Sequence, residues 1–191
     1  MKLRFLSLFS GIEAASVAWK PLGWECVAVA EIEPFPCAAL AHRYPKVPNL
    51  GDVTKITRKQ IKDLGNIDVV IFGSPCQDLS VAGKRAGLKG ERSGLFFDAV
   101  KIVKWAHECC GARFALWENV PGAFSSNQGR DFAEVVGELA GVRVQVPEHG
   151  WGTEGAAVGR NGLVEWSTLD AQWFGVAQRR RRVFALLDLG D

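Results

Sequence analysis

The sequence predicts an α/β fold: a three-layer sandwich with a mostly parallel sheet and an antiparallel strand near the C-terminal edge. Three observations lead to this expectation. Short apolar runs alternate along the chain with stretches whose apolar residues recur at helical spacing. The first two predicted strands enclose a predicted helix, as in a βαβ unit. Polar or glycine-containing segments follow the apolar runs, at the strand ends where open α/β sheets bind ligands.

The composition is typical of one soluble domain. The chain has 191 residues, of which 48% are hydrophobic and 23% charged, so we expect a single domain over residues 1–191. The net charge of +2 does not by itself indicate a nucleic-acid partner. Its distribution is more informative, because Arg179–Arg182 form a dense cationic block and the 81–94 segment adds further lysines and arginines. Such clusters suit phosphate contacts, although many charge runs are only solvated surface.

Five cysteines show neither a paired framework nor zinc-ligand spacing, so we expect a reducing environment and no metal. The N-terminal apolar run is interrupted early by Ser7 and Ser10, which argues against a signal peptide. No apolar stretch is long enough to span a bilayer. These features predict a cytoplasmic protein without a membrane partner.

The first part of the chain is predicted to alternate between strands and helices. Gly23 and Pro45 mark two helix ends, because glycine favours the left-handed C-terminal position and proline interrupts a helix. The predicted strands are 3–8, 26–30 and 68–72, and the predicted helices are 12–22, 35–42 and 56–64.

The second part continues the pattern with one strong helix, 95–110, closed by Gly111. Further strands are predicted at 114–117, 142–146, 163–169 and 183–187, with a helix at 132–139. We expect residues 148–162 to form a loop, since five glycines make a packed element unfavourable. Residues 171–177 are predicted to form a turn before the arginine block.

The turn after the first predicted strand has features of a nucleoside-binding site. Gly11 allows close approach of the backbone, and Glu31 follows about 20 residues later, where a carboxylate can accept ribose hydroxyls. A single glycine in the turn favours a nucleoside-type cofactor over NAD or FAD. Asp52 could accept from an adenine amino group or cap a turn. The alternative is a plain βαβ core with an exposed acidic loop.

Gly73-Ser74-Pro75-Cys76-Gln77 follows the 68–72 run and predicts a constrained loop at a strand end. Cys76 could act there as a nucleophile, or could simply be a small buried residue. Glu118 follows the 114–117 run, at the same expected edge, and can donate or accept a proton. No histidine lies in a motif near either residue, which weakens the hypothesis of a Cys-His hydrolase.

These motifs together resemble the DNA cytosine-5 methyltransferases. The resemblance rests on six segments in the family's order, covering nearly the whole chain: Phe9-Ser10-Gly11, Gly51-Asp52-Val53-Thr54, Gly73-Ser74-Pro75-Cys76-Gln77, Leu95-Phe96-Phe97-Asp98, Glu118-Asn119-Val120, and Gln178-Arg179-Arg180-Arg181-Arg182-Val183-Phe184. One such tripeptide means little, but the ordered set is specific.

The resemblance implies a Rossmann-like methyltransferase fold and methyl transfer from S-adenosylmethionine to C5 of a cytosine flipped out of double-stranded DNA. It implies that Cys76 attacks C6 of the ring and that Glu118 acts at N3. Arg180 and Arg182 would contact the cytosine and its phosphate. The implied cofactor-binding residues are Phe9, Gly11, Glu31, Ile32, Asp52 and Pro75. The implied substrate-binding residues are Ser74, Gln77, Asn119 and Val120.

The chain also departs from the family pattern. Glu13 stands where the family usually has the second glycine of its first motif, and Ile32 and Ala177 replace an aromatic residue and a proline. A target-recognition region and the family's final helix are not evident after the arginine motif. We therefore expect a fragment, a second chain that supplies target recognition, or a degenerate protein. The alternative hypothesis is a truncated or regulatory homologue that binds cofactor or DNA without turnover.

Overall fold

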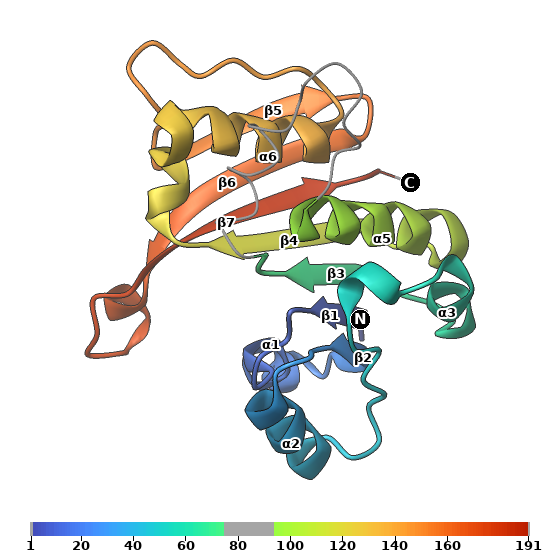
Figure 1. Ribbon diagram of the computed structural model, residues 1–191. Helices are drawn as coiled ribbons and strands as arrows, with labels where there is room; N and C mark the ends of the chain where they lie inside the picture. Colours follow the sequence, from blue (N-terminus) through green and yellow to red (C-terminus); the bar gives the residue numbers. More distant parts are fainter. Residues whose placement is uncertain (1, 75–93, 191) are drawn as a thin grey trace. The chain divides into compact units, whose positions relative to one another are not determined.

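The computed structural model describes residues 2–74 and 94–190 (Figure 1). Cys76, Pro75, Gln77 and the 81–93 segment lie outside the described residues. The strands form a seven-stranded sheet in the order β2-β1-β3-β4-β7-β6-β5. The chain divides into two compact units, one with residues 2–73 and 97–115 and the other with residues 74, 94–96 and 116–190. Each unit is described by itself below.

The first unit is organised around β1 (Arg4–Leu8), which pairs in parallel with β2 (Glu25–Ala30) on one side and β3 (Val69–Phe72) on the other. Phe5 lies opposite Cys26 in β2 and Val69 in β3. Four of the five β1 residues are buried, as expected for a central parallel strand covered on both faces. The strand predictions 3–8, 26–30 and 68–72 are confirmed to within about two residues at either end.

The helices of the first unit begin and end at residues that the sequence marks. They are α1 (Ala14–Trp19), α2 (Pro34–Arg43), α3 (Arg58–Asp63) and the 97–110 part of α5 (Leu95–Cys110). Pro34 occupies the first turn of α2, where its missing N–H costs nothing. Thr57 and Gln60 form a reciprocal capping box at the start of α3. Gly23 has φ +70° and ends the short 3₁₀ turn 20–22 that continues α1.

The second unit contains the end of β4 (Phe114–Asn119), α6 (Arg130–Ala140), and the antiparallel strands β5 (Glu154–Gly159), β6 (Gly162–Asp170) and β7 (Arg181–Asp188). Helix α6 packs against these three strands (Figure 1). Its Phe132 ring is fully buried and makes edge-on contacts with Trp151 and Trp166, whose centroids lie 4.8 and 5.6 Å away. This aromatic cluster is the core of the second unit.

The expected strand at 142–146 is wrong. The N–H of Val142 donates to Gly137 O at the end of α6, so it is not available to a neighbouring strand. The side chains of Val144 and Val146 lie beside Gly137 and Gly129, at the two ends of α6. The alternating valines therefore pack along a helix, and this apolar alternation mimics the pattern of a half-buried strand.

The expected loop at 148–162 is also wrong in part, because residues 154–159 form β5. Its glycines serve close packing: a side-chain carbon on Gly155 would lie 2.2 Å from the Trp166 indole, and one on Gly159 would lie 2.2 Å from Ala140 O. Gly159 pairs with Gly162 at the turn into β6. Glycine can thus mark close approach inside a strand as well as a loop.

The remaining strand and helix predictions are confirmed with adjusted ends. Strand β4 continues through Glu118 and Asn119, so these residues are its last two rather than the start of a loop. The α/β class is confirmed, but "mostly parallel" only approximates the sheet: the pairs around β1 are parallel, whereas β5, β6 and β7 are antiparallel. Among residues 2–74 and 94–190, we find no helix with the length and apolar character needed to cross a membrane.

The Phe132 cluster generates a stability prediction. Phe132→Ala should lower the free energy of unfolding by about 3–5 kcal/mol, because it leaves a cavity among four aromatic rings, those of Trp117, Phe124, Trp151 and Trp166. Urea unfolding measures the change. Val158→Ala is the matched control, because Val158 is 75% exposed on β5 and its loss should cost less than about 0.5 kcal/mol. Equal effects of the two substitutions would contradict this account of the core.

Candidate active site

The turn after β1 and the carboxylate after β2 are in direct contact in the first unit. The Gly11 N–H donates to Glu31 Oε2 at 2.7 Å. The adjacent Ser10 N–H donates to Ala30 O at 3.1 Å, and the Ala30 N–H donates to Ser10 Oγ at 3.1 Å. The ends of two neighbouring parallel strands are thus joined by backbone and side-chain hydrogen bonds.

Glu31 is held in place from its other side as well. Its Oε1 accepts from the N–H groups of Ile32 and Glu33, both at 2.8 Å, just before α2 begins. Asn49 brackets the same residue: its Oδ1 accepts from Glu31 N–H and its Nδ2 donates to Glu31 O, both at 3.0 Å. The sequence analysis missed Asn49. Its position just before the Gly51-Asp52 motif was the available signal.

Asp52 caps the 3₁₀ turn 53–55, so the turn-capping alternative describes its observed contacts. Oδ1 accepts from Thr54 Oγ1 at 2.8 Å and Thr54 N–H at 2.9 Å, and Lys55 Nζ lies 3.5 Å from Oδ2. The hydrogen bonds from the Thr54 hydroxyl and backbone hold the pKa of Asp52 below its usual value. Oδ2 is shared only with an exposed lysine and is open to a further donor.

Glu13 is the unexpected residue of this region, because it is a carboxyl group buried to 1% exposure. It adopts φ +68°, a left-handed conformation that usually favours glycine, and its Oε1 caps α1 by accepting from Ser16 N–H at 3.0 Å. Among the described residues Oε2 has no hydrogen-bond partner. Burial therefore raises the pKa of Glu13.

The 9–13 turn concentrates unusual backbone conformations. Phe9, Gly11 and Glu13 all have positive φ, at +53°, +53° and +68°. For the two residues other than glycine, this conformation costs on the order of 1–3 kcal/mol each and tends to occur at ligand-binding sites. A side-chain carbon on Gly11 would meet nothing within 4 Å, so its surface is open.

These first-unit residues fit a nucleoside-type cofactor chemically. Glu31 Oε1 accepts two backbone donors, whereas Oε2 accepts only that of Gly11 and keeps acceptor capacity that suits a ribose hydroxyl. Ile32 is 63% exposed beside it and offers an apolar surface for a base. Phe9 and Gly11 line the turn that Glu31 holds. Gly11, Glu31 and Ile32 are therefore brought together, and Asn49 Oδ1 joins Glu31 to the turn that carries Asp52 by accepting from the N–H groups of Glu31 and Gly51.

A second group of predicted site residues lies in the second unit, at the C-terminal end of β4. Arg182 Nε lies 2.9 Å from Glu118 Oε1, although the two residues belong to motifs far apart in the sequence. Both side chains are partly buried, with exposed fractions of 23% and 34%. The guanidinium orients the carboxylate and leaves its second oxygen free of this contact.

Asn119 and Ser74 stabilise the backbone beside Glu118. Asn119 Nδ2 donates to Ser74 O at 3.0 Å, and Trp117 Nε1 donates to Ser74 Oγ at 3.2 Å. Asn119 Oδ1 also accepts from Val120 N–H at 2.8 Å. Because Ser74 and Asn119 are buried, these bonds rigidly tie the residue before Pro75 to the end of β4. Ser74 and Asn119, two of the predicted substrate-binding residues, therefore stabilise the fold.

Arg180 and Val120 are placed differently. Arg180 is exposed, and its backbone N–H donates to Asp170 Oδ1 at 3.0 Å. Val120 is 41% exposed at the start of the 3₁₀ turn 121–124. Within residues 2–74 and 94–190, no group of three or more His, Cys, Asp or Glu side chains could hold a metal.

Two of the described cysteines are poorly suited to nucleophilic chemistry. Burial, with a further contribution from Glu13, raises the pKa of Cys26 to about 12. Burial also raises the pKa of Cys110. Both therefore stay protonated near neutral pH, where a thiol is a weak nucleophile.

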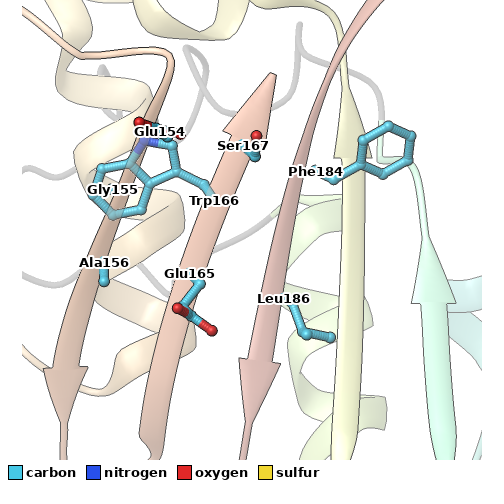
Figure 2. A pocket seen from close by; sticks show the side chains of 8 residues that line it. All are labelled: Glu154, Gly155, Ala156, Glu165, Trp166, Ser167, Phe184 and Leu186. Atoms are coloured by element: carbon cyan, nitrogen blue, oxygen red, sulfur yellow. The ribbon is translucent and has the colours of Figure 1, made fainter. Parts of the chain in front are cut away.

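A hollow of about 600 Å³ lies on β5, β6 and β7 of the second unit (Figure 2). Ala156, Glu165 and Leu186 form one row across the three strands, and Glu154, Ser167 and Phe184 form the next. Glu154 and Glu165 are exposed, which makes this surface unfavourable for a phosphate backbone. The hollow contains none of the predicted site residues.

The strand order, the β1–α1 turn with its acidic partner after β2, and the Glu118–Arg182 pair are features of a Rossmann-like methyltransferase. A family model described as "C-5 cytosine-specific DNA methylase" matches residues 3–189. The chain belongs to this family, as its motifs indicated. Members of the family use S-adenosylmethionine, so the predicted cofactor agrees with the family.

Similarity to curated proteins extends over nearly the whole chain. It is 41% identical to a protein of Escherichia phage P1 named "DNA N-6-adenine-methyltransferase", with 97% of this chain and 28% of that protein covered. It is 32% identical to the Type II methyltransferase M.NgoBV of Neisseria gonorrhoeae, with 96% and 40% covered. The chain therefore spans less than half the length of these relatives.

Solved structures agree on the fold. The Dnmt2 methyltransferase of S. pombe superposes with a TM-score of 0.67 at 19% identity, covering 100% of this chain and 53% of the other. The DNMT2 of Spodoptera frugiperda gives 0.67 at 23% identity, covering 98% and 50%. At these identities the similarity supports the fold alone.

The buried carboxyl of Glu13 generates a pH prediction. Its raised pKa means that the folded state binds more protons than the unfolded state, so stability falls as the pH rises above the ordinary value of 4.5. Glu13→Gln removes the ionisable group but keeps the shape and the Oε1 acceptor. The variant should unfold at higher urea concentration than the unsubstituted chain at pH 7.5, and the gain should shrink toward pH 4.

Glu33→Gln is the control for Glu13, because Glu33 is an exposed carboxyl near the same turn. It should give no gain at either pH. A Glu13→Gln variant that is equally or less stable than the unsubstituted chain at pH 7.5 would contradict the burial argument.

Proposed function

We propose that this chain carries the catalytic part of an enzyme that transfers a methyl group from S-adenosylmethionine to C5 of cytosine in DNA. The observation that carries the proposal is the contact between Glu118 and Arg182. It joins the Glu-Asn-Val motif to the arginine motif at the C-terminal end of β4, where α/β proteins carry their chemistry. Membership of the C-5 cytosine-specific DNA methylase family supports the same reaction.

Cytosine C5 is a weak nucleophile, so the chemistry needs a group that adds to the ring first. In our proposal the Cys76 thiolate forms a bond to C6 of a flipped-out cytosine, and Glu118 hydrogen-bonds N3 and supplies a proton there as electron density moves to C5. S-adenosylmethionine, when bound, would supply an electrophilic methyl group for C5 and leave as S-adenosylhomocysteine. Loss of the C5 proton, release of Cys76 and return of the N3 proton to Glu118 then restore the aromatic ring. The base that removes this proton is not assigned.

The positioning residues act around these two groups. Arg182 orients Glu118, and Arg180 is exposed and available for a phosphate. The bonds from Asn119 and Trp117 hold Ser74, the residue that precedes the Pro75-Cys76-Gln77 segment in the sequence. Phe9, Gly11, Glu31, Ile32 and Asp52 would hold the nucleoside part of the cofactor.

Methylation of adenine N6 is the alternative suggested by the phage P1 relative. The match covers only 28% of that protein, so its name describes a much longer chain. Adenine N6 is an exocyclic amine that can take a methyl group directly, without a thiolate adding to the ring. The Pro-Cys-Gln motif together with Glu118 therefore favours the cytosine reaction.

A chain that binds cofactor or DNA without turnover is the other alternative. The chain spans 40% of the length of two Type II methyltransferase relatives, and none of its residues is assigned to reading a target sequence. Double-stranded DNA is the nucleic-acid partner both in the proposed reaction and in this alternative. Activity and binding must therefore be measured separately.

The reaction is tested by tritium transfer from labelled S-adenosylmethionine to mixed-sequence DNA, followed by digestion to nucleosides. We expect label in 5-methylcytosine, and we expect Cys76→Ala to abolish it because no bond to C6 can form. Cys109→Ala is the control cysteine and should retain activity, because among the described residues Cys109 contacts Arg58 of α3 and no predicted site residue. Label in N6-methyladenine would support the alternative reaction and refute ours, and cofactor binding without transfer would support the non-enzymatic alternative.

Glu118→Gln tests the proton-transfer role. The amide keeps the shape but cannot supply the proton, so the turnover rate should fall by roughly 10²- to 10⁴-fold with little change in cofactor affinity. Arg182→Lys, which keeps the charge but loses the planar guanidinium, should give a smaller loss. Single-turnover assays separate the chemical step from binding. A Glu118→Gln variant with unchanged turnover would exclude Glu118 from the proton transfer.

A further inference from the structure

The connection between β6 and β7, residues 171–180, forms a closed projection that we name the β6–β7 loop. The two strands pair down to Asp170 and Arg181, so the loop leaves from the very end of the ladder. Its base is closed by Ala171 N–H donating to Arg180 O at 3.0 Å and by Arg180 N–H donating to Asp170 Oδ1 at 3.0 Å. Figure 1 shows the loop extending beyond the ends of β6 and β7.

The loop presents two adjacent aromatic rings to solvent. Trp173 is 79% exposed and Phe174 is 66% exposed, at the end of the 3₁₀ turn 171–174. Gly175, with φ +81°, ends this turn. Leaving two large rings in water is unfavourable for the folded chain, and such exposed apolar groups mark surfaces that bind something.

The charge of the loop indicates what it binds. Arg179, Arg180 and Arg181 are exposed, and residues 171–182 contain no aspartate or glutamate. Asp170, the acidic residue next to the loop in the sequence, accepts from the N–H groups of Gln172 and Arg180 and from the Gln172 side chain, and Glu118 is paired with Arg182. An uncompensated cationic surface with exposed rings fits a nucleic-acid strand, whose bases stack on aromatic side chains while its phosphates pair with arginine.

The loop also lies next to the proposed catalytic group. Arg182, two residues beyond the loop, contacts Glu118. Because Arg182 near the start of β7 contacts Glu118 near the end of β4, the loop leaves the sheet beside the place where a displaced cytosine would be bound in the proposed function. Bases beside a displaced nucleotide lose one stacking neighbour, and an aromatic ring can replace it.

We propose that the β6–β7 loop binds a DNA strand beside the reacting cytosine. Trp173 and Phe174 stack on exposed bases, and Arg179 of the loop and Arg181 at the start of β7 contact phosphates. The proposal rests on the proposed function for the identity of the strand. The proposed binding surface consists of described residues and does not include Glu118 or Arg182.

The test is the affinity of the full chain for a fluorescein-labelled DNA duplex with an unpaired central cytosine, measured by fluorescence anisotropy without cofactor. Trp173→Ala should weaken binding by about 5- to 100-fold, the effect of losing one stacked base. Trp173→Phe keeps a ring and should restore most of the affinity. Arg179→Gln should reduce the slope of log affinity against log salt by about one.

Val158→Ala is the matched control, because Val158 is an equally exposed apolar residue on β5 outside the loop. Its affinity should equal that of the unsubstituted chain, and all variants should keep the same thermal midpoint. An affinity of Trp173→Ala within about twofold of the Val158→Ala control, or no detectable binding by the unsubstituted chain, overturns the proposal.

The two proposals can fail independently. Loss of binding in Trp173→Ala, with no methyl transfer by the unsubstituted chain, supports the loop and refutes the enzymatic function. Methyl transfer by the unsubstituted chain, together with normal DNA binding by Trp173→Ala, supports the enzymatic function and refutes the proposed role of the loop.

Discussion

The parallel pairing of β1 between β2 and β3 is the constraint on which the first unit depends. Because the strands run in the same direction, the turn after β1 and the segment after β2 emerge side by side, and Gly11 can donate directly to Glu31. Two polar strand ends that are distant in the sequence thereby become one surface. The same pairing requires the chain to turn sharply within residues 9–13, where Phe9 and Glu13 adopt positive φ.

Glu13 shows how such a turn can be built without a second glycine. The left-handed conformation that glycine would adopt at little cost is stabilised here by a side chain that caps α1. The compensation has a consequence, since the same carboxyl becomes buried and its Oε2 has no hydrogen-bond partner within residues 2–74 and 94–190. A substitution that is unusual for the family pattern is therefore compatible with the same backbone path.

In the second unit, the end of β4 is the segment that positions the candidate site residues. Trp117, Glu118 and Asn119 are consecutive, yet their side chains do different work because successive residues of a strand point to opposite faces. Trp117 and Asn119 bond Ser74 in the interior, while Glu118 meets Arg182 at the partly exposed side. Reactive and structural functions are separated by strand geometry alone, which allows the Glu-Asn-Val motif to serve both.

The sequence by itself determined the α/β class, most element positions and the family, because strand ends carry glycine and polar residues and because the motifs keep a fixed order. It also identified Glu31, Glu118 and Arg182 as candidate site residues, although the roles of these residues remain predictions. It could not separate the valines of 142–146, which pack on α6, from a strand, since both environments bury alternate residues. Nor could it distinguish the glycines of β5 from loop glycines, because the reason for them is the Trp166 ring, which is distant in the sequence. The Glu118–Arg182 contact, the burial of Glu13 and the exposure of Trp173 were decided only by the tertiary structure, because each depends on which distant segments pack around the side chain.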